Sequence, residues 1–182
     1  MARYLDRVTK QWYEPATDTG DCGAGHIRNP DLSGVVGVPQ SRWVIDGDTV
    51  RAPTSEENAA FDAADLAAAK SAKMTAIDER TSQLVTAGVE VATGKTISTS
   101  LAATQNLQNL WIGFQQGIIT LPKAISTTDG GVYVVTDNAD LIRIAGVLRD
   151  FQLGILTAGQ ALRASVAACT TVAEVDAVED TR

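Results

Sequence analysis

The sequence is poor in the residues that most often carry chemistry. Its 182 residues include two cysteines, Cys22 and Cys169, and one histidine, His26. A single histidine leaves a Ser-His-Asp relay at most one candidate base. Two cysteines so far apart form neither a CxxC pair nor a disulfide framework, so we expect reduced thiols in a protein assembled in a reducing cytoplasm. We therefore predict no catalytic, cofactor-binding or metal-binding residues, no cofactor and no enzymatic activity.

Basic charge and long apolar runs are also scarce. Lys and Arg together number 15 against 22 Asp and Glu, a formal net charge of -7, which predicts no nucleic-acid partner because such surfaces need basic residues. No stretch approaches the roughly 18 apolar residues of a membrane span, and Met1–Arg7 has no apolar signal core. We expect no membrane partner and no export by the usual route.

An alanine-rich segment from Pro53 to about Ala87 is predicted to be one long helix. Thr54 and Glu57 have the spacing of a capping box, and Gly88 stands where a C-terminal cap residue is expected. At 1.5 Å per residue the helix would be roughly 50 Å long, which indicates a stalk or an inter-subunit helix.

Small and apolar residues recur along this helix at alternating steps of three and four, the period of coiled coils and bundles. A seam of this kind also suits packing within one domain, and we favour the contact between copies. The seam is Ala60, Ala63, Ala67, Lys70, Met74, Ile77, Thr81 and Leu84, of which Ala63, Ala67, Met74, Ile77 and Leu84 are the predicted oligomer contacts.

Residues 1–52 are predicted to be irregular and rich in turns, with a β-hairpin over 42–50 around Asp46-Gly47-Asp48. The apolar residues of this region occur in short groups, so we expect it to have little hydrophobic core of its own. The region nevertheless includes two of the three tryptophans. Aromatic residues in such a segment indicate packing against another chain. The predicted virion-docking residues are Trp12, Tyr13, Val36 and Trp43.

Residues 88–182 are predicted to form a small α+β domain. The pattern indicates a hairpin over 89–99, a helix over 100–116, a second hairpin over 118–136, a long helix capped by Asp137 and a short terminal helix. The predicted fold class is therefore α+β, divided into 1–52, 53–87 and 88–182.

Three motifs imitate chemical sites. Thr93-Gly94-Lys95-Thr96 ends like a P-loop, but that motif needs glycine where Val89 stands, and the predicted order is strand, turn, strand. Carboxylates in the loops could bind Ca²⁺, and others could form a glycosidase pair, although turns and helix surfaces explain them equally well. The loop carboxylates are Asp18, Asp21, Asp46 and Asp48, and the candidate pair would come from Asp78, Glu79, Glu90, Asp137 and Asp140.

Residues 70–180 resemble a phage domain of unknown function found in tailed-phage proteins encoded near tail fibres. The resemblance rests on KMTAIDER at 73–80, on 88–91 with 94–97, and on the helix ending near Trp111. It continues through VYVVT at 132–136 and the last helix from Leu162, followed by 170–175. The resemblance implies a virion or virion-assembly role and brings no catalytic residues.

The expected function is that of a structural component of a tailed-phage virion, in a tail fibre or associated with the baseplate. We expect a homotrimer, because repeated subunits close symmetrically and fibres generally are trimers, with other tail or baseplate proteins as partners. A capsid decoration or neck protein, a fibre-assembly chaperone and, last, a glycan hydrolase are the alternatives. Contact with a host surface receptor is left open.

Overall fold

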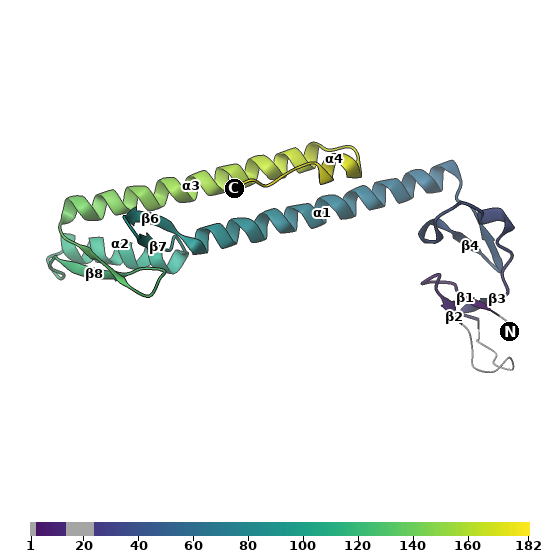
Figure 1. Cartoon of the computed structure of the whole chain (residues 1–182), viewed down its shortest axis with the longest axis horizontal. Helices are drawn as coiled ribbons and strands as arrows, with labels where there is room; N and C mark the ends of the chain where they lie inside the picture. Colours follow the sequence, from purple (N-terminus) through teal and green to yellow (C-terminus); the bar gives the residue numbers. More distant parts are fainter. Residues whose placement is uncertain (1–2, 14–23) are drawn as a thin grey trace. The chain divides into compact units, whose positions relative to one another are not determined.

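The computed structural model describes residues 3–13 and 24–182, and the chain divides into two units, Met1–Asp65 and Leu66–Arg182 (Figure 1). The fold is mixed α+β, as predicted. Helix α1, Ser55–Ala87, contributes its first residues to the first unit and the rest to the second, so it is not a separate part of the chain.

The first unit is built from short strands and turns. Strand β1 lies between β2 and β3 in an antiparallel sheet, and β4 pairs with β5 through a two-residue loop at Gly47 and Asp48. These elements are β1 Tyr4–Asp6, β2 Trp12–Tyr13, β3 His26–Arg28, the 3-10 turns η1 Ser33–Val35 and η2 Gln40–Arg42, β4 Val44–Asp46 and β5 Thr49–Arg51.

The expectation that this region has little core is wrong. Five apolar side chains from separate strands and turns converge and are at most 9% exposed. Because each comes from a short element, no periodic pattern marks them in the sequence. They are Leu5, Ile27, Val35, Trp43 and Val50.

The start of α1 is fixed by the predicted capping box and by two arginines of the first unit. The Glu57 amide donates to Thr54 Oγ1 at 3.2 Å, and the Thr54 amide donates to Glu57 Oε2 at 2.7 Å. Arg51 donates to both oxygens of Glu57, at 2.7 and 2.8 Å. Further along the helix, Arg42 bridges Asp62 at 2.6 Å and Asp65 at 2.8 Å.

The second unit joins two hairpins to three helices. These elements are β6 Val89–Ala92, β7 Lys95–Ile97, α2 Leu101–Gln115, β8 Lys123–Ser126, β9 Val132–Val135, α3 Asn138–Ala168 and α4 Val172–Asp176, with the later part of α1. The predicted cap at Asp137 is confirmed, because its side chain accepts from the Asp140 amide. Ser100 accepts from the Ala103 amide in the same way, and Thr171 forms a capping box with Glu174.

Gly88 separates α1 from β6 in a conformation that needs glycine. Its φ is +83°, and a Cβ there would lie 2.1 Å from the carbonyl oxygen of Ile97. The first strand of the second hairpin is shorter than predicted. The amides of Ile118 and Ile119 both donate to the Gly113 carbonyl, which holds them at the end of α2 and not in a strand.

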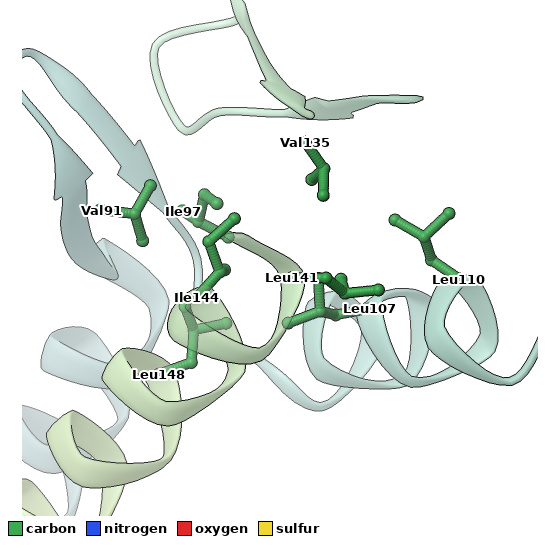
Figure 2. Packing of buried hydrophobic residues seen from close by; sticks show 8 residues of the cluster. All are labelled: Val91, Ile97, Leu107, Leu110, Val135, Leu141, Ile144 and Leu148. Atoms are coloured by element: carbon green, nitrogen blue, oxygen red, sulfur yellow. The ribbon is translucent and has the colours of Figure 1, made fainter. Parts of the chain in front are cut away.

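One apolar core lies where α2, the first part of α3 and both hairpins meet (Figure 2). Its members are 7% exposed or less. They are Val91, Ile97, Leu107, Leu110, Val135, Leu141, Ile144 and Leu148.

A separate core joins the later parts of α1 and α3 to α4. Ile77, Val166 and Val175 are each at most 2% exposed, and Leu66, Met74 and Leu162 are among the half-buried residues around them. In Figure 1 α3 runs beside the later part of α1, and α4 folds back along them. A single helix, α3, therefore serves both cores of the second unit.

A half-buried arginine links α1 to α3 beside this core. The side chain of Arg182 is 13% exposed, and its guanidinium donates to Thr81 Oγ1 at 3.0 Å and to the carbonyls of Ile155 and Ile77 at 3.1 and 3.3 Å. Asp180 neutralises its charge through contacts at 2.6 and 2.8 Å. The site is polar but fully hydrogen-bonded, which is the condition under which burial of a charge is tolerated.

The Glu57 carboxylate provides the first prediction. Hydrogen bonds from the Arg51 side chain and the Thr54 amide lower the pKa of Glu57 from 4.5 to about 2. Since the folded-state pKa lies below the unfolded value, the stabilisation is present above pH 4.5 and is lost as the pH falls from 4.5 towards 2. NMR titration of Glu57 should give a midpoint near 2, and Arg51→Ala should move it towards 4.5. Arg42→Ala is the matched control and should leave the midpoint unchanged; an unmoved midpoint in Arg51→Ala would contradict this account.

Two glycines within α3 provide a matched pair for the Arg182 contact. A Cβ at Gly159 would lie 2.8 Å from Arg182 Nη1 and 3.0 Å from Thr81 Oγ1, whereas a Cβ at Gly154 meets nothing within 4 Å. Gly154→Ala should therefore stabilise the protein by about 0.5–1 kcal/mol through helix propensity. Gly159→Ala should destabilise it by about 1–2 kcal/mol, because the lost hydrogen bonds of a charged group outweigh that gain.

Denaturant unfolding monitored by circular dichroism would measure both changes. In an Arg182→Ala background Gly159→Ala should destabilise the protein less, because the guanidinium is gone and only Thr81 Oγ1, at 3.0 Å, still lies close to the added Cβ. If Gly159→Ala destabilised that background equally, Arg182 would not be the cause.

Candidate interaction surfaces

A groove of about 620 Å³ lies between α2 and α3. Leu107, Leu141 and Leu148 of the core form part of its lining, and Trp111 stands at its side, 45% exposed. Its polar residues are Thr104, Gln108, Arg149 and Gln152, so the lining carries a single ionic group.

Exposed apolar residues extend the groove along both helices. On α2, Leu101 continues the face that carries Thr104, Gln108 and Trp111, at steps of three, four and three. On α3, Ile142, Arg149, Leu153 and Leu156 follow one another at steps of seven, four and three, which keeps them on one face. We call the five apolar side chains the α2–α3 patch: Leu101 at 73% exposed, Trp111 at 45%, Ile142 at 56%, Leu153 at 55% and Leu156 at 47%.

Sequence reasoning missed this patch. The inward apolar face of α3 dominates the periodic signal, and the helical spacing of Trp111 from Leu107 and Phe114 is typical of a core residue. The outer residues follow a helical period of their own, which was the signal that could have revealed them.

The residues of the seam predicted along α1 differ in burial: some pack within the chain and others are exposed. Met74 and Ile77 pack against α3 and α4 of the same chain, and Lys70 Nζ donates to the Ala167 carbonyl at 2.7 Å. The assignment of Ile77 and Met74 to contacts between copies is therefore corrected, because the chain's own helices already cover them. Leu84 is half-buried, and Ala63 and Ala67 are exposed.

The predicted docking residues of the first unit also differ in burial: one lies in the core and three are exposed. Trp43 belongs to its core, 9% exposed, and its indole N–H donates to the Val38 carbonyl at 2.9 Å, so it is not available for docking. Trp12 and Tyr13 on β2 are 39% and 50% exposed, and Val36 is 85% exposed. Docking through these three remains a prediction.

The residues that imitate chemical sites hold structural positions. Gly94 lies in the turn between β6 and β7, where its amide donates to Glu90 Oε1 at 2.7 Å and so already has an anionic partner within the hairpin. Asp78 pairs with Arg163, and Asp48 pairs with Arg7. Asp18, Asp21 and Cys22 lie outside the described residues.

Asp140 has the most elaborate surroundings among these carboxylates. It accepts from Tyr133 Oη at 2.9 and 3.0 Å and from Arg143 at 2.7 Å, and Arg143 also donates to the Val91 carbonyl. Partial burial raises the pKa of Asp140, but the bonds from Arg143 and Tyr133 outweigh it and hold the pKa below its usual value. The cluster joins β9, α3 and β6 and has a structural role.

The single histidine, His26, lies 3.7 Å from Asp6, and its ring contacts Tyr13.

A scan against protein-family models finds no match, and comparisons with curated proteins and with solved structures find none either. The resemblance of residues 70–180 to the tailed-phage domain therefore stays a prediction from the sequence. Within the part of the chain that the structure describes, no helix is both long and apolar enough to cross a bilayer.

The corrected position of Ile77 changes what its substitution should do. Ile77→Ala would leave a cavity between α1, α3 and α4 and should lower the free energy of unfolding by about 2–5 kcal/mol. Thr75→Ala, on the exposed side of the same helix, should change it by less than about 0.5 kcal/mol. Denaturant unfolding measures both, and a loss of association without a loss of stability would restore the inter-chain assignment.

Proposed function

We propose that the chain is a non-enzymatic structural component of a tailed-phage particle, located in a tail fibre or at the baseplate, that acts as a homotrimer. The observation that carries the proposal is the α2–α3 patch. Trp111 and Ile142 line the groove, the other three members continue the same helix faces, and exposed apolar surface of this kind marks a protein contact. The assignment to a phage rests on the resemblance of residues 70–180.

A structural role also agrees with how the polar residues are used. The carboxylates considered for catalysis cap helices, pair with arginines or close turns, as Asp137, Asp78 and Glu90 do. Each such bond fixes the local backbone. Carboxylates used in this way make the fold rigid, and a component of a particle needs a rigid fold.

The two units suit two kinds of neighbour. The first presents Trp12, Tyr13 and Val36, which we assign to docking on tail or baseplate proteins of the virion. The second presents the α2–α3 patch, which we assign to a protein contact within the particle. Contact with a host receptor is no part of this proposal.

The test is the location of the chain in purified particles of the phage that encodes it. Mass spectrometry should detect it at a constant ratio to the major capsid protein, and antibody labelling in electron micrographs should mark the tail tip. Labelling over the capsid would instead identify a decoration protein. Its absence from finished particles, with loss of fibres when the gene is deleted, would identify an assembly chaperone; either result would overturn the proposal.

A further inference from the structure

We propose that the α2–α3 patch is the surface through which copies of this chain associate. This places self-association on the outer face of α2 and α3 and away from the α1 seam, whose later part is covered by the chain itself. The inference rests on the self-association in the proposed function and adds the surface responsible.

The area of the patch is sufficient for such a contact. A side chain of this size that is about half exposed leaves on the order of 100 Å² in water. The five members therefore present roughly 500 Å², at the upper end for an apolar patch on a monomer. Three such patches meeting around one axis would together remove about 1,500 Å² from water before their polar rim is added, an amount in the range that stable associations bury.

The charge of the patch favours a second copy as its occupant. The chain carries a net charge of -7, so two copies repel each other over most of their surface. Arg149 is the one ionic group among the described residues that line the groove, and it contacts Asp150 at 2.8 and 3.0 Å, which gives that position a neutral pair. Copies can therefore meet here without bringing net like charges together.

The form of the patch indicates a helix as the contacting element. Its α3 members lie on one helical face, and the groove lies between α3 and α2, which is where a further helix would pack in a bundle. The same face of a second copy supplies such a helix with matching apolar side chains. In the homotrimer of the proposed function, this face of three copies would converge on one three-fold axis, a closed symmetry of the kind usual for repeated subunits.

The experiment uses the full chain and measures its mass by light scattering and sedimentation over a range of concentrations. The wild type should be an oligomer of the 19.1 kDa chain, and Leu153→Glu should raise the dissociation constant by about 100-fold or more, because a charge would be buried without a partner. Val8→Glu is the matched control. It makes the same change of charge at a residue 86% exposed in the first unit and should leave the mass unchanged.

Circular dichroism would show that each variant is folded, as expected for half-exposed positions. Leu156→Glu is the second variant, to be used if Leu153→Glu fails to fold, and it should likewise dissociate the oligomer. A monomeric wild type, or oligomers that survive either folded variant, would overturn the inference. If the oligomer survived Leu153→Glu but the chain was found at the tail tip, only the assignment of the surface would be wrong. If Leu153→Glu dissociated the oligomer but the chain was absent from particles, only the proposed function would be wrong.

Discussion

The second unit depends on the inward apolar face of α3. Leu141, Ile144 and Leu148 at its beginning pack with α2 and both hairpins, and Val166 near its end packs with α1 and α4. Neither hairpin has more than two strands, and isolated two-stranded hairpins are marginal in water. Their stability therefore comes from packing on α3.

Polar contacts then fix the elements that this packing brings together. The Tyr133–Asp140–Arg143 cluster ties a hairpin to the start of α3, and Thr99 joins α1 to the loop before α2 through bonds to the Val85 carbonyl. Arg182 does the same between α1 and α3. Because an unpaired buried group is costly, each of these bonds favours one arrangement of the helices over others.

Features set by a few neighbouring residues could be predicted from the sequence. The capping boxes at Thr54 and Thr171, the glycine after α1 and the turns of the hairpins all follow from local chemistry, and all are present in the structure. Features that depend on distant partners could not. The sequence shows that Ile77 and Trp43 prefer burial, but not that α3 and the turn after β3 supply the covering surface.

The same limit applies to the candidate surface. The outer face of α3 was hidden by the stronger inner pattern, since an exposed Leu153 and a buried Leu148 are the same residue type in the sequence. Only the placement of α2 and the hairpins decides which leucines remain in water. A sequence pattern therefore indicates how much apolar surface a helix has, while the tertiary structure decides how much is left over.

The separation in sequence between α1 and its covering residues has a consequence for synthesis of the chain. Arg182 bonds to Ile77 and Thr81, more than a hundred residues earlier, and Val166 and Val175 also follow Ile77 by many residues. A chain emerging from the ribosome exposes its N-terminal segments first, so the α1 seam is uncovered until α3 and α4 emerge. During that interval the apolar seam of α1 is exposed to neighbouring nascent chains, and folding of α3 and α4 then covers its later part.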